Sequence, residues 1–275
     1  MRLTQMQSEC VCIENRAAQQ GRALYISIIR QPLHMTLQAS DPVSYFWSGD
    51  ALRSRSVSAR VFSGVVDVPQ PPVRLMADWQ REPVLQSLEP GDVESLPLAR
   101  ARMRWPQYRQ CVEAVADWIR GLGLQDALAG AEVALMACRG ARYHHDGAQY
   151  GGAAFCNLFL SEDQGLDVHF PAAGQRIALV RGTVLVFDTC QPHAVVARSS
   201  TGFDVADFAD RPERTSIFLT WELPLDDARL VHLLGIGLDT DAARAAQLHE
   251  EQVWVNAAPA SVCPQSGRWR TALDA

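Results

Sequence analysis

Three polar residues in the second half of the chain are of types that bind transition metals. His144 and Asp146 are separated by one residue at the end of an apolar segment, and His193 begins another apolar segment. On a strand, residues i and i+2 project from the same face, so His144 and Asp146 can converge on one point. Two imidazoles and one carboxylate on one face of a metal leave adjacent positions open, an arrangement that suits non-haem Fe(II). The alternative for His193 considered alone is a buried structural histidine.

A second pair of polar residues lies further along the chain. Arg214 and Ser216 share a face by the same two-residue period and precede an apolar segment. An inward guanidinium there would be partly desolvated and would need an anionic partner, whereas an edge arginine would keep its charge in water. All 25 basic residues are arginine, which excludes Schiff-base catalysis and a Walker-type phosphate loop.

The segments that must position these residues have the composition of strands. Short runs rich in Val, Ile, Leu and Phe are separated by polar or glycine-containing turns, without helical spacers. This pattern predicts an antiparallel sandwich or barrel of the jelly-roll kind, within a mainly β fold with flanking helices (α+β). The runs are 131–145, 153–160, 165–171, 176–180, 183–187, 193–199 and 214–223.

The remainder of the 275-residue chain is predicted to support this core within a single domain. Residues 1–130 are expected to supply helices and strands, with strand-like segments from 23 to about 68 and a helix over 106–121. Residues 131–224 form the predicted core with the metal site. Residues 225–275 show helical spacing and are expected to form a C-terminal helical segment.

Residues 142–223 resemble the core of the Fe(II)- and 2-oxoglutarate-dependent oxygenases, which carry an H-x-D…H…R-x-S signature on a double-stranded β-helix. The resemblance implies that His144, Asp146 and His193 bind iron. It also implies that Arg214 and Ser216 bind the distal carboxylate of 2-oxoglutarate. Asn157, on the next strand, is a further candidate for a hydrogen bond to this cosubstrate.

The interval between His193 and Arg214 is longer than is usual in that family. The polar, turn-rich residues 199–213 are therefore interpreted as an inserted loop and a candidate lid. Two other arginines are candidates for the cavity. Arg198 lies on the face opposite His193, so Arg214 is preferred as the anchor. Arg142 has the parity of His144 and could face the cavity, and the alternative is an arginine at the surface.

The resemblance implies an oxidoreductase that uses Fe(II), 2-oxoglutarate and dioxygen and releases succinate and carbon dioxide. Related halogenases have a small residue in place of the aspartate, so Asp146 favours hydroxylation, with desaturation or ring closure as other outcomes. The expected substrate is a small molecule such as a free amino acid or a biosynthetic intermediate. The alternatives are a cupin-like metalloenzyme that does not use 2-oxoglutarate and a non-catalytic jelly-roll binding module.

Composition excludes several other classes of protein. The formal net charge of −6 argues against nucleic-acid binding, which depends on basic surface. The longest apolar runs, such as Val133–Cys138, are far shorter than the roughly 20 residues needed to cross a bilayer. No apolar segment typical of a secretory signal follows the first arginine, so a cytoplasmic location and no membrane partner are expected.

Overall fold

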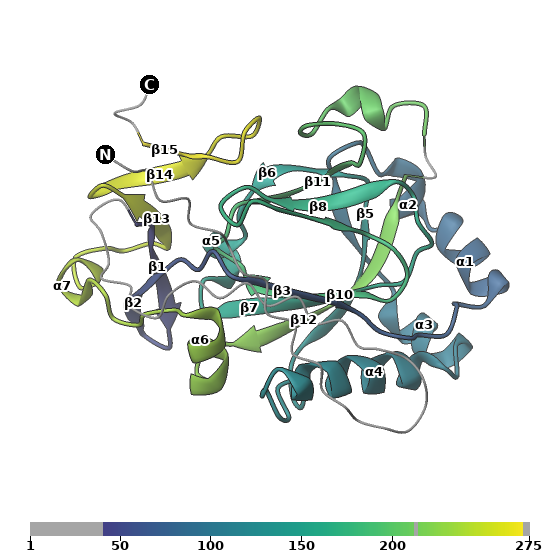
Figure 1. Ribbon diagram of the computed structural model, residues 1–275, viewed down its shortest axis with the longest axis horizontal. Coiled ribbons are helices and arrows are strands. Elements are labelled where there is room, and N and C mark those ends of the chain that lie inside the picture. Colours follow the sequence, from purple (N-terminus) through teal and green to yellow (C-terminus); the bar gives the residue numbers. More distant parts are fainter. Residues whose placement is uncertain (1–40, 212–213, 272–275) are drawn as a thin grey trace, which may run out of the picture.

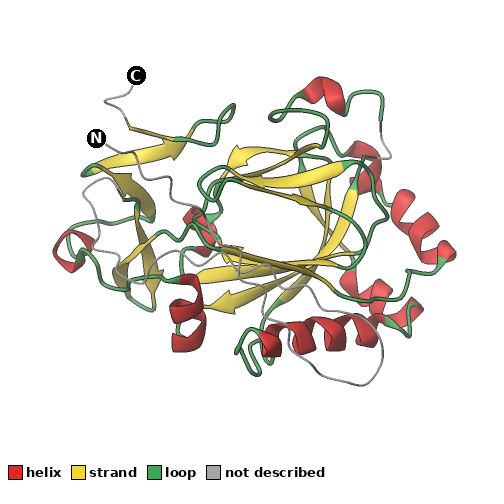
Figure 2. Cartoon of the chain, in the orientation of Figure 1, coloured by secondary structure: helices red, strands yellow, loops and turns green. Residues whose placement is uncertain are grey.

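The core is a pair of antiparallel sheets that face one another and enclose an apolar interior (Figures 1 and 2). The computed structural model describes residues 41–211 and 214–271. One sheet has the strand order β3-β10-β7-β12-β5-β4 and the other has the order β6-β11-β8-β9. The core strands are β5 (Val133–Cys138), β6 (Ala141–His144), β7 (Ala153–Phe159), β8 (Leu166–Phe170), β9 (Gln175–Ala178), β10 (Thr183–Asp188), β11 (His193–Ala197) and β12 (Ser216–Pro224).

The chain alternates between the two sheets as it passes through β5, β6, β7 and β8, and again through β9, β10, β11 and β12. This alternation defines a double-stranded β-helix, so the predicted fold class is confirmed. Every predicted run between 131 and 223 contains a strand, and the first run contains two because the chain turns at Gly140, which has φ 75°. Glycine adopts this left-handed conformation without the penalty that a side chain brings.

Four helices lie beside the first sheet, and two further strands complete its edges. The helices are α1 (Val73–Gln80), α2 (Pro83–Ser87), α3 (Leu98–Arg104) and α4 (Tyr108–Gly121), and β3 (Val61–Val65) and β4 (Val93–Leu96) form the edges of that sheet. Helix α4 buries Cys111, Val115 and Trp118 at i, i+4 and i+7, in one apolar cluster with the sheet. The predicted helix over 106–121 is therefore confirmed, beginning at Tyr108.

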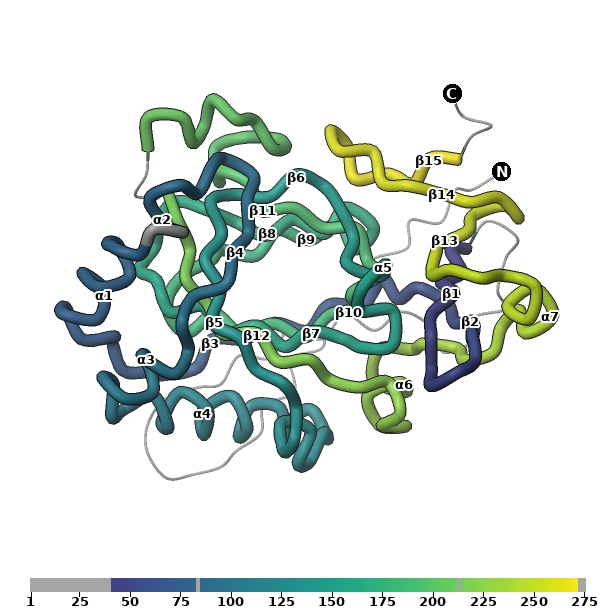
Figure 3. The backbone as a smooth tube through the Cα atoms, turned by 180° about the vertical axis from the view of Figure 1, so that it is seen from behind, coloured from purple at the N-terminus to yellow at the C-terminus, as the bar shows by residue number. Residues whose placement is uncertain are grey.

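A third sheet lies beside the barrel, next to the short helix α5 (Gly147–Tyr150) (Figures 1 and 3). Its strands, in the order β15-β14-β13-β1-β2, come from both ends of the described chain. They are β1 (Val43–Ser48), β2 (Ala51–Ser56), β13 (Gln252–Val255), β14 (Ala258–Val262) and β15 (Trp269–Thr271). Strands are thus observed in the described part of the predicted 23–68 segment, and residues 23–40 lie outside the described residues.

The prediction of a helical segment over 225–275 is only partly correct. Helices α6 (Ala228–Leu234) and α7 (Ala242–Ala245) are short, and strands β13 to β15 follow. Asn256 and Ala257 both have positive φ and join β13 to β14 in a two-residue hairpin, while β13 pairs with β1. Pairing with a distant strand therefore overrides the local helical spacing. Within the described ranges, no helix combines the length and apolar character needed to span a membrane.

Candidate metal centre

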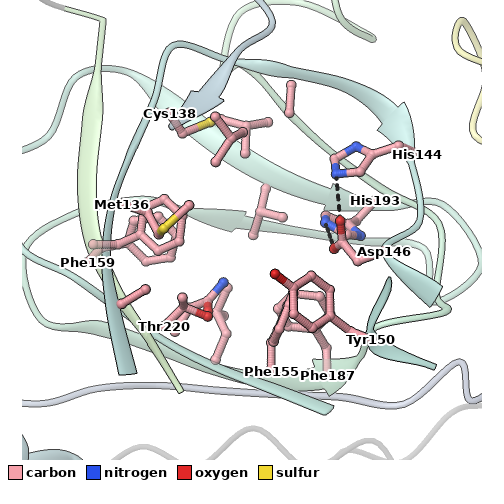
Figure 4. A pocket seen from close by; sticks show the side chains of 18 of the residues that line it. Met136, Cys138, His144, Asp146, Tyr150, Phe155, Phe159, Phe187, His193 and Thr220 are labelled. Carbon is pink, nitrogen blue, oxygen red and sulfur yellow. Dashed lines mark ion pairs between the residues drawn. The ribbon is translucent and has the colours of Figure 1, made fainter. Parts of the chain in front are cut away.

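The three predicted metal ligands lie together at one end of the barrel, where β6 ends and β11 begins. His144 and His193 are directly paired across these strands, with ring centroids 4.5 Å apart. Asp146 follows β6 and places one carboxylate oxygen 3.5 Å from Nε2 of His144 and the other 3.5 Å from Nε2 of His193. One ligand atom from each residue lies within 4.8 Å of the others (Figure 4). We call this the metal end of the barrel.

Backbone carbonyls orient both imidazole rings. Nδ1 of His144 lies 2.7 Å from the carbonyl oxygen of Arg142, and Nδ1 of His193 lies 2.9 Å from that of Gln191. A carbonyl oxygen only accepts hydrogen bonds, so Nδ1 carries the proton in each ring and Nε2 presents a lone pair. Burial, together with the nearby His144 ring, lowers the pKa of His193 to about 4. His193 therefore offers a neutral nitrogen ligand at neutral pH.

A turn at residues 188–191 connects the metal end to the third sheet. Asp188 is fully buried and accepts two hydrogen bonds from the guanidinium of Arg55, at 2.8 and 2.9 Å. Arg55, on β2, also donates to the carbonyl oxygen of Gly151. The same turn supplies the Gln191 carbonyl that orients His193, and the Thr189 carbonyl accepts from the backbone N–H of Asp146 at 2.8 Å. Arg55 and Asp188 could not be recognised from sequence, because their pairing joins residues 133 positions apart.

A cavity of about 270 Å³ extends from the metal end into the barrel. Three cross-strand pairs of β7 and β12 line one wall: Phe155 with Glu222, Asn157 with Thr220, and Phe159 with Phe218. The other lining residues, apart from the three ligands, are Val93, Ala134, Met136, Cys138, Ala141, Gln149, Tyr150, Val168, Leu185, Phe187 and Val195. Figure 4 shows Met136, Cys138 and Phe159 on the side away from the metal ligands. The part of the cavity away from the ligands is thus lined by apolar side chains.

Two polar side chains in the middle of this wall lack partners. Oδ1 of Asn157 and Oγ1 of Thr220 are buried and make no hydrogen bond with the described residues. Buried polar atoms are usually paired, so an unpaired set inside a cavity fits a ligand that supplies the missing hydrogen bonds. Asn157 lines the cavity as the sequence analysis expected, and its role toward the cosubstrate stays a prediction.

The structure does not bring Arg214 and Ser216 to the cavity lining. Nη1 of Arg214 donates to the carbonyl oxygen of Asp207 at 2.8 Å, and Ser216 is buried at the start of β12. The inward positions of β12 that reach the cavity are Phe218, Thr220 and Glu222, so Arg214 has the predicted parity but lies before the strand begins. Its role toward 2-oxoglutarate stays a prediction.

The inserted loop packs onto the barrel through its aromatic residues. Phe208 is fully buried in the interior cluster and stacks with Phe203 at 5.5 Å between ring centroids. A side chain at Gly140, just before β6, would meet the Phe208 ring at 2.6 Å. Phe208 therefore lies where β6 begins, away from the ligands where β6 ends. We call this the loop end of the barrel; Figure 1 shows the loop on the side away from the third sheet.

The two other arginines considered from sequence both lie outside the cavity lining. Arg198 pairs with Asp163 and Asp167, as expected for the outward face. Arg142 is exposed, with its guanidinium 5.7 Å from the centroid of the Phe203 ring, so the surface position is the one observed. A bulge explains why parity with His144 does not place Arg142 in the cavity: His144 and Ala141 pair with His193 and Val195, so β6 contains one extra residue and the two-residue period breaks.

Comparison with known proteins gives likenesses among solved structures only. No family model matches the chain, and no curated protein sequence matches it. A prolyl-4-hydroxylase from Pseudomonas putida is 18% identical over 60% of this chain and 92% of its own, with a TM-score of 0.35. The viral collagen prolyl hydroxylase of Paramecium Bursaria Chlorella virus-1, in its 2OG complex, is 9% identical over 48% of this chain and 78% of its own, with a TM-score of 0.30. A truncated form of that enzyme is 10% identical over 55% of this chain and 83% of its own, with a TM-score of 0.32.

The strand order and the ligand geometry settle two points independently of these likenesses. The chain has a double-stranded β-helix, and His144, Asp146 and His193 form a His-Asp-His constellation within it. Both features are those that the resemblance to the Fe(II)- and 2-oxoglutarate-dependent oxygenases implied.

Proposed function

We propose that the protein is an Fe(II)- and 2-oxoglutarate-dependent dioxygenase that hydroxylates a small molecule, such as a free amino acid or a biosynthetic intermediate. The observation that carries this proposal is the convergence of His144, Asp146 and His193 at the end of a largely apolar cavity. Two neutral imidazoles and one carboxylate are the donor set of non-haem Fe(II) sites with open positions. The metal, when bound, would supply the activation of dioxygen.

The chain's own residues would hold the metal and exclude water from the reacting groups. The carbonyls behind His144 and His193 keep both Nε2 atoms directed toward Asp146. Phe155 and Phe187 line the cavity near the ligands, with ring centroids 6.0 Å apart, and they limit the access of water to that part of the cavity.

The fit to 2-oxoglutarate rests on Asn157 and Thr220. The unpaired Thr220 hydroxyl could donate a hydrogen bond to a carboxylate, and the Asn157 side chain could donate one through its amide N–H, whereas its unpaired Oδ1 only accepts. For Arg214 to neutralise that carboxylate, its guanidinium must exchange the Asp207 carbonyl for the cosubstrate.

Succinate release tests the proposal. The purified protein is incubated with Fe(II), ascorbate and 2-oxoglutarate, with and without a library of small metabolites, and succinate is quantified. We expect iron-dependent succinate formation that a substrate stimulates, and its loss in His144→Ala. Arg142→Ala serves as the control, because Arg142 is exposed and outside the cavity lining. An iron-loaded wild type that forms no succinate with any library member would refute the proposed activity.

One observation favours a second candidate, a metalloenzyme of the same fold that does not use 2-oxoglutarate. Among the described residues that line the cavity, none is an arginine, whereas a dicarboxylate cosubstrate needs a cationic partner. Metal content distinguishes the candidates: preferential retention of zinc with no response to 2-oxoglutarate would support this alternative.

A further inference from the structure

Negative charge gathers in the cavity beside the metal ligands. Glu222 lines it together with Asp146, and no guanidinium comes from the described lining residues. The Glu222 carboxylate forms no ion pair or hydrogen bond with any residue that the structure describes. Burial and the nearby Glu132 carboxylate raise the pKa of Glu222. An anionic group without a counter-ion in a partly buried position is costly unless a ligand neutralises it.

Aromatic rings surround the same part of the cavity. Tyr150 and Phe155 contact edge to face with centroids 4.9 Å apart, and Phe155 packs against Phe187 in the same way. Phe155 is also the cross-strand partner of Glu222. Aromatic faces attract organic cations, and the attraction grows when water is excluded. A carboxylate beside aromatic rings is therefore a suitable environment for a positively charged group.

A second, independent feature indicates a ligand rich in hydrogen-bond donors. Asn157 is only 8% exposed, lines the cavity, and leaves Oδ1 without a donor among the described residues. It pairs with Thr220, two residues along β12 from Glu222 and on the same face of that strand. Both groups are acceptors that lack donors, and ammonium and guanidinium groups carry donors without acceptors.

We propose that the substrate is a small organic cation, a guanidinium or primary ammonium compound with a short aliphatic chain, whose charge Glu222 binds beside Tyr150 and Phe155. This inference rests on the proposed function, because it concerns the substrate of the same site. The volume of about 270 Å³ limits the ligand to a small molecule. With Fe(II), Asp146, Glu222 and a 2-oxoglutarate dianion present, negative formal charge would exceed positive charge, and a cationic substrate would reduce this excess.

Binding of two matched probes tests the inference. n-Butylguanidinium and n-butylurea have nearly the same shape and differ by one positive charge. Their dissociation constants are measured by ligand-observed NMR titration of the anaerobic, Fe(II)-loaded protein, with and without 2-oxoglutarate. A charge-assisted hydrogen bond contributes enough to weaken binding about 10- to 100-fold when it is lost. We therefore expect wild type to prefer the cation by at least about tenfold.

The variant Glu222→Gln should abolish this preference by weakening the binding of n-butylguanidinium far more than that of n-butylurea. Glu94→Gln is the matched control, because it removes the same charge from an exposed position on β4 and should retain the preference. Metal uptake by Glu222→Gln confirms that the barrel has folded. Where that variant fails to fold, the comparison of the two probes in wild type decides the question alone.

The outcomes for this inference and for the proposed function are separate. Equal affinity of wild type for the two probes, or an unchanged preference in Glu222→Gln, would overturn the cationic substrate. Selective binding of the cation without succinate formation from any substrate would refute the dioxygenase activity and leave the binding assignment standing. Succinate formation that only neutral or anionic compounds stimulate would support the dioxygenase activity and refute the cationic substrate.

Discussion

The two ends of the barrel use their polar groups differently. At the metal end, backbone carbonyls fix two imidazole rings, and a buried ion pair between Arg55 and Asp188 fixes the turn that supplies one of those carbonyls. At the loop end, the apolar Phe208 ring closes the interior. The metal end thus holds side chains whose lone pairs stay free to bind a ligand, whereas the loop end is stabilised by the packing of apolar side chains.

The guanidinium groups of two arginines at the loop end donate hydrogen bonds to backbone carbonyl oxygens, mostly those of the inserted loop. Arg139 donates to the carbonyl oxygens of Leu88 and Phe208, and Arg214 donates to that of Asp207. Each guanidinium carries a charge that these neutral oxygens do not cancel. The loop end therefore places these two guanidinium groups outside the cavity lining, whereas Asp146 and Glu222 place negative charge inside it.

The largest effect is expected from removing a ligand at the metal end. His193→Ala deletes one of three donors and opens the contact with Asp146, so we expect iron binding and turnover to be abolished. Iron content after anaerobic loading and desalting measures this directly. Phe208→Leu, at the loop end, should keep its iron; a variant without His193 that retained stoichiometric iron would contradict the assignment of the centre.

The next effect concerns the buried ion pair that connects the third sheet to the metal end. Asp188→Asn leaves the fully buried Arg55 guanidinium without its counter-ion, and breaking such a pair costs about 3–5 kcal/mol of unfolding free energy. Chemical denaturation measures this loss. Because the same turn orients His193 and Asp146, the ligand-field spectrum of the Co(II)-substituted protein should change as well. An unaltered spectrum would show that the turn supports stability alone.

The metal end could be predicted from sequence because its key relations are local or strand-periodic. His144 and Asp146 are two residues apart, and His193 begins a clearly apolar segment, so knowing the sheet pattern suffices to bring them together. The Arg55–Asp188 pair had no such signal, since it depends on how a separate sheet packs against the barrel.

The loop end could not be predicted in the same way. Parity along β12 puts Arg214 on the same face as Ser216, but it could not reveal that the strand begins only at Ser216 and that the cavity is reached only from Phe218 onward. The bulge in β6 likewise explains why parity with His144 does not place Arg142 in the cavity. The short helix α7 followed by a hairpin shows the same limitation, because pairing between β13 and β1 is a tertiary effect.

Arg214→Ala tests whether the cation of the loop end serves the cavity. If Arg214 binds the distal carboxylate of 2-oxoglutarate, its loss should raise the cosubstrate concentration required for half-maximal turnover by about one to two powers of ten. Iron content should stay at the wild-type level, since Arg214 does not belong to the ligand set. Arg198→Ala is the matched control because Arg198 pairs outward with Asp163 and Asp167. If the cosubstrate dependence of Arg214→Ala is unchanged, Arg214 does not bind 2-oxoglutarate, and its role is the hydrogen bond to the Asp207 carbonyl oxygen.

The smallest effect is expected from neutralising Glu222 in the metal-free protein, and its sign is opposite to the others. The folded-state pKa of Glu222 is raised above its ordinary value, mainly by burial, so the folded protein binds more protons than the unfolded chain once the pH rises above that ordinary value. Ionised Glu222 therefore destabilises the fold at neutral pH, and the destabilisation fades as the pH falls toward the ordinary pKa of a glutamate.

Glu222→Gln should consequently stabilise the metal-free protein at pH 7 by less than about 1 kcal/mol, because a partly exposed group is screened by solvent. The gain should shrink as the pH is lowered, and Glu94→Gln, which changes an exposed carboxylate on β4, should show no such gain. Denaturation midpoints of the three proteins between pH 4 and 7 provide the measurement. A destabilised Glu222→Gln at neutral pH would mean that the carboxylate contributes to the fold. Retaining a carboxylate that weakens the fold is the pattern expected of a residue kept for binding.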